Sequence, residues 1–214
     1  FLEQGELKSS QFAYRLALKL VPNNPDFNWN LSFVELLTGN YNTGWEHFEW
    51  RIKRKNSKQV HAQPNLQVWE GEELKSNEKL LVVSEQGLGD TIQYMRYIPY
   101  LQKQGMNISF CAQEKLHTLI KCSGIHPDPL TPKQANLVSE GKWIPLLSIP
   151  RYLKISPQNP IITEPYISAS DALITKWKNI LSQEKRPIIG INWQGSQKLE
   201  KTYRGRSVPL KAFS

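Results

Sequence analysis

The spacing of apolar and polar positions in residues 1–56 is typical of helices. A glycine, a polar residue and a large apolar residue occur together twice, beginning at Gly5 and at Gly39, an offset of 34 residues. Each glycine is followed by a small residue after five positions and by an aromatic residue after nine: Ser10 and Tyr14, Gly44 and Phe48. The small residue permits close approach of two helices, and the glycine breaks the chain between them. This pattern predicts helix hairpins that repeat with the period of a helical-repeat protein.

The following region alternates between short apolar runs and helix-spaced apolar stripes. The pattern predicts strands at 79–84 and 107–112, and helices at 90–104 and 114–122. Pro99 predicts a kink or a break in the first of these helices. An order of strand, helix, strand and helix indicates an α/β fold, with a mostly parallel sheet and helices on its faces.

The last ninety residues have a less regular pattern. Seven prolines between 127 and 160 indicate short strands and long loops. A capping pattern from Ser168 to Asp171 then predicts the start of a helix. The apolar stripe that follows is expected to face a core: Leu173, Trp177, Ile180 and Leu181. A final strand is predicted at 187–193.

The segment Glu-Gln-Gly-Leu-Gly-Asp-Thr at 85–91 joins the first predicted strand to the first predicted helix. A dinucleotide fingerprint would need a third glycine where Ile92 stands, and a P-loop would need a lysine that is missing. The two glycines instead indicate close approach of the backbone to a ligand, before a helix N-terminus that favours negative charge. Asp90 can cap this helix or act as an ionised base, and the residues alone leave both roles open.

Charge and composition narrow the possible partners. The net charge is +8, and nine bases but two acids follow Asp171. This basic cluster favours an anionic partner, such as a nucleotide or a phosphorylated sugar, or is only a solubilising surface. Nucleic acid is a less favoured partner, because no recognisable module or interleaved aromatic residues accompany the bases. The four histidines lack metal-ligand spacing, so no metal site is expected.

The cysteines and the apolar runs indicate the compartment. Cys111 and Cys122 do not form a C-x-x-C pair, which favours reduced thiols and a cytoplasmic location. No run of about 18 apolar residues is present, so no membrane span is expected.

Two parts of the chain resemble known families. Residues 1–56 resemble tetratricopeptide repeats, as half of one repeat followed by a complete one with Trp29 and Leu31 on its first helix. From about Trp69 onward the chain resembles the glycosyltransferase-like domain that many bacteria fuse to such repeats, which is similar to the heptosyltransferases of the GT-B class. The motifs that carry this resemblance occur in the expected order: "EQGLGDTIQYMRY", "PYISASDALITKWKNIL", "IGINWQGS" and "RSVPL".

The resemblance implies a specific organisation. In the GT-B class two Rossmann-like domains face each other across a cleft. The expected parts are helical repeats at 1–56, a linker or docking segment at 57–70, a first Rossmann-like domain at 71–186, and the start of a second at 187–214. Because the chain begins at Phe1 and ends shortly after a new element starts, we expect a fragment of a longer protein, without transferase activity of its own.

The resemblance also implies a reaction. A sugar would pass from a nucleotide sugar to an acceptor hydroxyl with inversion, and Asp90 would be the general base. The loop that contacts the acceptor or a phosphate would consist of Gln86, Gly87, Leu88, Gly89 and Thr91. The leaving diphosphate would be stabilised, without a metal or other cofactor, by four bases: Lys198, Lys201, Arg204 and Arg206.

The partners implied are a nucleotide sugar, a glycan or protein acceptor, and a protein bound by the helical repeats. Two alternatives to an enzyme stay open. One is a protein-binding scaffold without catalysis, and the other is a nucleic-acid binder that uses the basic cluster.

Overall fold

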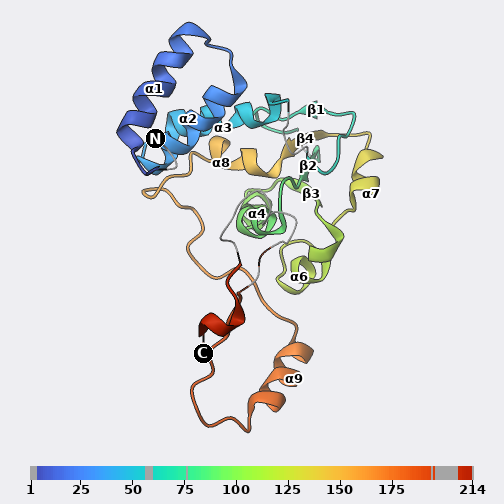
Figure 1. The fold of residues 1–214 in the computed structure, drawn as a ribbon. Coiled ribbons are helices and arrows are strands. Elements are labelled where there is room, and N and C mark those ends of the chain that lie inside the picture. Colours follow the sequence, from blue (N-terminus) through green and yellow to red (C-terminus); the bar gives the residue numbers. More distant parts are fainter. Residues whose placement is uncertain (1–3, 56–59, 76, 194, 196–206, 214) are drawn as a thin grey trace. The chain divides into compact units, whose positions relative to one another are not determined.

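The computed structural model describes residues 4–55, 60–75, 77–193, 195 and 207–213 (Figure 1). The chain divides into two compact units, Phe1–Ala169 and Ser170–Ser214, and each is described by itself. The helices of the first unit are α1 (Leu7–Leu20), α2 (Pro25–Leu37), α3 (Tyr41–Phe48), α4 (Leu88–Tyr94), α5 (Tyr97–Lys103), α6 (His117–Cys122), α7 (Pro132–Asn136) and α8 (Ile149–Tyr152). Its 3₁₀ helices are η2 (Glu49–Lys53), η3 (Glu114–Leu116) and η4 (Leu146–Ser148), and its strands are β1 (Gln67–Val68), β2 (Lys79–Val83), β3 (Asn107–Cys111) and β4 (Lys142–Pro145).

The helices predicted in the first 56 residues are confirmed. Gly5 and Gly39 have φ values of 78° and 86°, and each precedes a helix, α1 or α3, by two residues. This left-handed conformation is the reason for glycine at the two breaks. Gly44 of α3 lies against α2, because a Cβ there would be 2.9 Å from the side chain of Leu36. The small residue therefore permits the close approach of the two helices.

The four strands form one parallel sheet with the order β1-β4-β2-β3. Leu80 of the central strand β2 is opposite Ile108 of β3 on one side and Lys142 of β4 on the other. The strands predicted at 79–84 and 107–112 are thus confirmed to within one residue. The fold is mixed α/β with a parallel sheet, as the pattern predicts.

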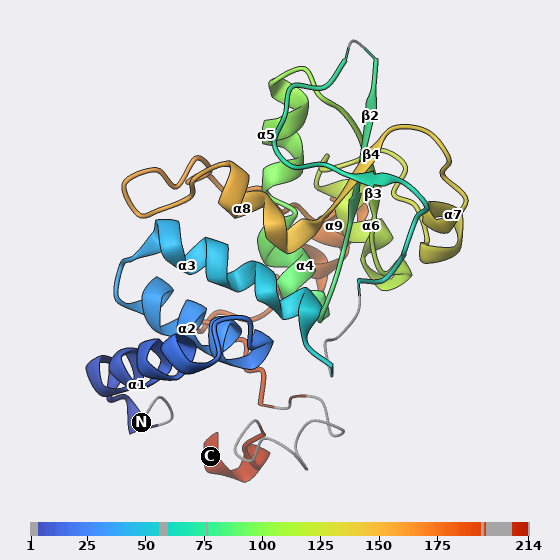
Figure 2. The ribbon, with the colours of Figure 1, turned by 90° about the horizontal axis from the view of Figure 1, so that it is seen from above.

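Both faces of the sheet are covered, as parallel sheets require. Side chains of β2 alternate between two apolar clusters: Leu80 and Val82 belong to one, and Leu81 and Val83 to the other. The first cluster contains apolar residues of α4, α5 and α6, and the second contains residues of α7 and of the segment 60–66. Figure 2 shows α5 and α7 on opposite sides of the sheet.

The helical segment α1–η2 packs on the α/β part of the same unit. The Trp45 indole donates a hydrogen bond to the Ile155 carbonyl at 2.8 Å, and Arg151 pairs with Glu46 at 2.6 Å. In Figure 1, α8 lies between α1–α3 and the sheet. The two parts also share one apolar cluster, which contains Phe48 of α3 and Leu80 of β2.

The helix predicted at 90–104 is two helices. The break falls at Met95 and Arg96, between α4 and α5, and not at Pro99. Pro99 is instead the third residue of α5. A proline is tolerated there, because the N–H groups of the first helical turn have no partner within the helix.

The second unit departs from the sequence prediction in three ways. Its helix α9 (Asp171–Leu181) is capped by Ser170 and not by Ser168. The Ser170 Oγ accepts a hydrogen bond from the Leu173 N–H. The apolar stripe of α9, predicted to face a core, is 40–54% exposed at Leu173, Trp177, Ile180 and Leu181, since α9 contains no buried residue.

Residues 187–193, predicted as a strand, form no strand in the part of the chain that the structure describes. The Trp193 carbonyl accepts a hydrogen bond from the Val208 N–H, but no ladder follows. Among the residues that the structure describes, the other element of this unit is the 3₁₀ helix η5 (Leu210–Phe213) (Figure 1). The sequence predicts that a second Rossmann-like domain starts at residue 187. The compact units divide between Ala169 and Ser170, and this division does not test whether such a domain begins at 187, so the boundary stays a prediction.

Candidate functional site

The carboxyl ends of β2 and β4 define the position of the candidate site. From β2 the chain passes through α4 and α5 to β3 on one side, whereas β4 lies on the other side of β2. The strand order thus reverses between β2 and β4. In open α/β sheets, ligands bind outside the carboxyl ends of the strands at such a reversal. The glycine-rich segment at 85–91 begins at this place, directly after Ser84.

Asp90 lies in the first turn of α4 and caps that helix. Its Oδ2 accepts a hydrogen bond from the Gly87 N–H at 2.9 Å. A Cβ at Gly87 would lie 3.1 Å from the same oxygen, so glycine permits this contact. Asp90 is half-buried, and among the described residues its other oxygen, Oδ1, has no hydrogen-bond partner. The Asp90 carboxylate therefore caps α4 with one oxygen and keeps the other available to accept a hydrogen bond or a proton.

The other residues of the predicted loop differ in accessibility. Leu88 is 41% exposed, and Gly89 is exposed with open space where a Cβ would lie. Thr91 is fully buried, and its hydroxyl donates to Gln113 Oε1 at 2.8 Å. Thr91 thus ties α4 to the segment after β3, and does not present its hydroxyl to a ligand.

His61 holds the loop from the segment before the sheet, a role that the sequence did not suggest. Its N–H donates to the Ser84 carbonyl at 2.9 Å, and Val60 pairs with Glu85 in an antiparallel bridge. The imidazole Nδ1 lies 2.8 Å from Ser84 Oγ, and Nε2 lies 3.2 Å from the Gln86 carbonyl. Because a carbonyl only accepts, this arrangement requires a proton on Nε2. Gln86, with φ at 60°, is thereby fixed in a conformation that few residues adopt.

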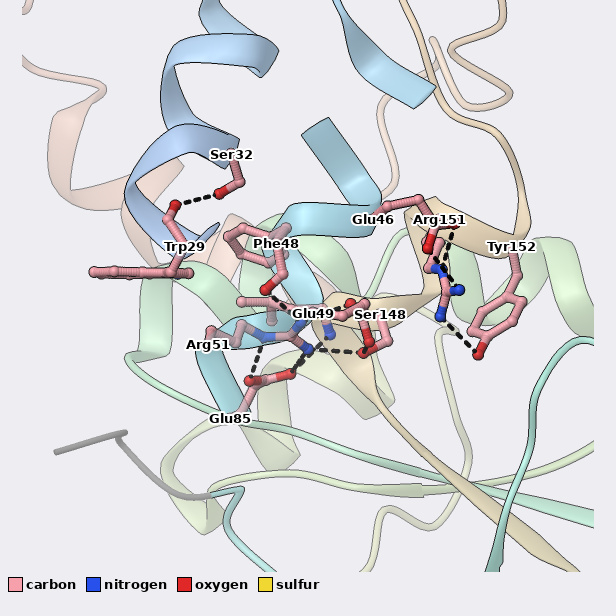
Figure 3. Close-up of polar contacts among 11 residues, drawn as sticks. Trp29, Ser32, Glu46, Phe48, Glu49, Arg51, Glu85, Ser148, Arg151 and Tyr152 are labelled. Carbon is pink, nitrogen blue, oxygen red and sulfur yellow. Dashed lines mark hydrogen bonds and ion pairs between the residues drawn. The ribbon is translucent and has the colours of Figure 1, made fainter. Parts of the chain in front are cut away.

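Arg51 of η2 reaches the same strand end (Figure 3). Its Nε donates to Glu85 Oε2 at 3.0 Å, and its NH2 group donates to Glu85 Oε1 at 2.7 Å. The two side chains are 4% and 2% exposed. Burial by itself lowers the pKa of Arg51, but the carboxylates of Glu85 and Glu49 outweigh it and raise the pKa above its usual value. No local pattern in the sequence predicts this pair, because its members are 34 positions apart.

Tyr94 is a further residue of this region that the sequence analysis did not select. It lies four positions after Asp90, on the same face of α4. Burial is the main cause that raises the pKa of Tyr94 to about 12, and Tyr97 adds to it. Arg51 acts in the opposite direction, and Asp90 and Glu85 raise the value further. The raised pKa shows that the Tyr94 hydroxyl lies in a largely desolvated place, and such a hydroxyl can donate a hydrogen bond. Its i, i+4 spacing from Asp90 was the available signal.

The remaining predicted site residues cannot be placed. Lys198, Lys201, Arg204 and Arg206 lie outside the described residues. Within the described part, no group of three or more His, Cys, Asp or Glu side chains could hold a metal ion. The histidines there have other contacts, such as His117 with the Ala112 carbonyl and His126 with the Ile108 carbonyl. Among the described helices, none is long and apolar enough to cross a membrane.

Comparison of the chain with protein-family models, with curated proteins and with solved structures finds no match. The resemblance to tetratricopeptide repeats and to heptosyltransferase-like domains therefore stays a prediction. The evidence for a function therefore lies in the carboxyl ends of β2 and β4, the loop at 85–91 and Asp90.

Proposed function

We propose that this chain contains the acceptor-binding half of a GT-B-type, heptosyltransferase-like glycosyltransferase, preceded by tetratricopeptide-like repeats. Asp90 is the general base in this proposal. The reaction transfers a sugar from a nucleotide sugar to an acceptor hydroxyl, with inversion at the anomeric carbon. The observation that carries the proposal is that the two carboxylate oxygens of Asp90 have different surroundings. Oδ2 caps α4, whereas Oδ1 has no partner among the described residues and is available where the strand order reverses.

A carboxylate with one oxygen hydrogen-bonded and the other available suits a general base that must keep its position. The hydrogen bond from the Gly87 N–H to Oδ2 fixes the orientation of the side chain. Oδ1 then accepts the proton of the acceptor hydroxyl while the hydroxyl oxygen bonds to the anomeric carbon. The bond from that carbon to the nucleotide diphosphate breaks, and the diphosphate leaves with the electron pair.

Two neighbours of Asp90 extend the site in this proposal. The open space at Gly89 permits the acceptor to approach the backbone of α4. Tyr94 lies four positions after Asp90 on the same helix face, and in this proposal its hydroxyl donates a hydrogen bond to an acceptor oxygen. Gln86, Gly87 and Leu88 complete the acceptor contact. The donor diphosphate is assigned to Lys198, Lys201, Arg204 and Arg206, as in the sequence analysis.

The test is a substitution at Asp90 in the natural polypeptide that carries this sequence. Release of nucleoside diphosphate is measured with a panel of nucleotide sugars and acceptors. Asp90→Asn keeps a carboxamide oxygen for the Gly87 N–H but removes the base, so turnover is expected to fall at least 100-fold. Asp128→Asn is the matched control, because the Asp128 side chain is 84% exposed and pairs with Lys121. Turnover of Asp90→Asn near the wild-type rate would exclude Asp90 as the base.

A second candidate function, protein binding, is favoured by the outward face of α1. Phe12, Leu16 and Leu20 lie four residues apart and are 72%, 50% and 79% exposed. Lys8 and Lys19 line a groove beside Phe12 and Leu16. An exposed apolar stripe flanked by bases fits an acidic amphipathic helix of a partner protein.

A synthetic amphipathic peptide, helical and rich in glutamate beside a leucine stripe, tests this second candidate. Its binding is expected to weaken at least tenfold in the double variant Phe12→Ala, Leu16→Ala, because the apolar contact is lost. Leu137→Ala is the control, since Leu137 is 82% exposed elsewhere in the unit. Equal binding of a peptide with lysine in place of glutamate would reject an acidic partner.

A further inference from the structure

The Arg51 guanidinium joins three segments that are distant in sequence. Besides Glu85, its NH2 group donates to Ser148 Oγ at 2.8 Å, and its NH1 group donates to Glu49 Oε1 at 2.7 Å. The Ser148 hydroxyl donates in turn to Glu49 Oε2 at 2.7 Å. Figure 3 shows these contacts converging on one side chain. Arg51 thus connects the helical segment with the ends of β2 and β4, the two strands between which the strand order reverses.

Glu85 depends on Arg51 for its charge compensation. The Glu85 carboxylate is 2% exposed, and its other recorded contact in the described part is the Leu147 N–H, at 3.2 Å from Oε1. A buried carboxylate without a cation is strongly unfavourable. The planar fork of arginine matches both carboxylate oxygens, which a single ammonium group cannot do.

The loop that follows Glu85 is held at both ends. At its start, Glu85 is fixed by Arg51, and the next carbonyl, of Gln86, is held by His61. At its end, Asp90 binds the Gly87 N–H. A change in the position of Glu85 is therefore transmitted through a short, constrained segment to the Asp90 carboxylate.

We infer that Arg51 is a positioning residue for the Asp90 loop. The helical segment is, by this contact, a structural part of the candidate site and not an independent appendage to it. The effect on catalysis rests on the proposed function, whereas the effect on the loop does not. Arg51 touches neither acceptor nor donor in this assignment, and it acts through Glu85.

Hydrogen exchange tests the effect on the loop without any assay of activity. In the full chain, Arg51→Lys keeps the charge but loses the fork. The amides of Gly87 and Thr91, which are the hydrogen-bonded ones recorded within 86–91, are expected to exchange at least tenfold faster. The amides of β3, which Arg51 does not contact, report any loss of global stability, and their exchange is expected to change less. Arg54→Lys is the matched control, because Arg54 pairs with Asp26 on the same segment and does not contact Glu85. Wild-type exchange of 86–91 in folded Arg51→Lys would overturn the inference.

A milder variant covers the case in which Arg51→Lys does not fold. Ser148→Ala removes one hydrogen bond to the guanidinium and leaves the Glu85 pair in place. It is expected to raise exchange at 86–91 about threefold, and exchange no faster than wild type would also overturn the inference.

The kinetic consequence separates this inference from the proposed function. Where the natural polypeptide shows transferase activity, Arg51→Lys is expected to lower kcat at least tenfold with a less than twofold change in the KM for the nucleotide sugar. A raised KM with unchanged kcat would overturn the positioning role. If Asp90→Asn retains activity while Arg51→Lys still loosens 86–91, the proposed base is wrong and the loop assignment stands.

Discussion

Gly87 and Gly89 are two positions apart in the sequence, but they are required for different physical reasons. At Gly87 a Cβ would crowd the capping oxygen of Asp90, at 3.1 Å. At Gly89 a Cβ would meet nothing within 4 Å, so the packing of this chain does not require glycine there. A glycine without a steric reason inside the fold is what close approach of a ligand predicts.

The two glycines therefore give a matched pair of variants. Gly87→Ala is expected to destabilise the fold by about 1 kcal/mol, because alanine is a poor N-cap and crowds Asp90. Gly89→Ala is expected to leave the stability within about 0.5 kcal/mol or to raise it, since alanine is the better helix former. Urea unfolding measures both. A loss of turnover in the stable Gly89→Ala variant would support acceptor binding at this position, and full turnover would argue against it.

At the scale of elements, a side-chain cap marks the start of α2 but not the start of α3. The Asn24 side chain accepts hydrogen bonds from the N–H groups of Asp26 and Phe27, both at 3.0 Å, and Pro25 follows it at the first helical position. Asn40 occupies the equivalent place before α3, but its side chain makes no capping hydrogen bond. The same residue type thus has a capping role at one helix only.

This difference predicts unequal costs of substitution. Asn24→Ala is expected to lower the free energy of unfolding by about 1 kcal/mol, because two backbone donors lose their acceptor. Asn40→Ala is expected to cost less than about 0.5 kcal/mol. Urea unfolding of the two variants checks the comparison, and a larger loss at Asn40 would contradict the assignment of caps.

Some of the strands and helices could be predicted from the sequence alone, and others could not. The runs at 79–83 and 107–111 were predictable because a buried parallel strand is apolar on both faces. The short α7 and α8 were missed among the prolines of 125–165, although Thr131, Pro132 and Gln134 form a capping box with proline at the first helical position. The stripe of α9 had the right period, but periodicity cannot show whether another segment covers it.

The candidate site was predictable only where it is local in sequence. Asp90 and the two glycines lie within one short segment between a strand and a helix, so their proximity follows from the chain itself. Arg51 and His61 are 34 and 23 residues away from their partners, Glu85 and Ser84. Contacts across such separations depend on tertiary packing, which no local pattern encodes.

At the scale of the whole molecule, the first unit contains helical and α/β parts that share one core. Phe48 of α3 belongs to the same buried cluster as Leu80 of β2 and Ile149 of α8. The buried pair between Arg51 and Glu85 crosses the same boundary. We therefore expect residues 4–169 to unfold as one cooperative unit, which is the condition under which a single free energy of unfolding has meaning.

Two desolvated acidic groups of the first unit, the Cys111 thiol and the Tyr94 phenol, predict how its stability changes in alkali. Burial raises the pKa of the Cys111 thiol to about 12 from an ordinary 9.0, and it raises the pKa of Tyr94 to about 12 from 10.0. Both folded-state values lie above the unfolded ones, so the unfolded chain loses these protons first as pH rises. The contribution of each group is complete below its unfolded pKa and is lost between that value and about 12.

Urea midpoints between pH 8 and pH 11 measure this loss. For Tyr94 alone, a shift of this size corresponds to about 1 kcal/mol by pH 11, and the thiol adds a larger share because its titration in the unfolded chain begins earlier. Tyr94→Phe removes only the phenol and is expected to flatten the decline above pH 10. Tyr166→Phe is the control, because it also removes one tyrosine hydroxyl, one that donates to the Ile92 carbonyl. An unchanged decline in Tyr94→Phe would show that the Tyr94 hydroxyl is not held in a desolvated position, and would remove it from the proposed site.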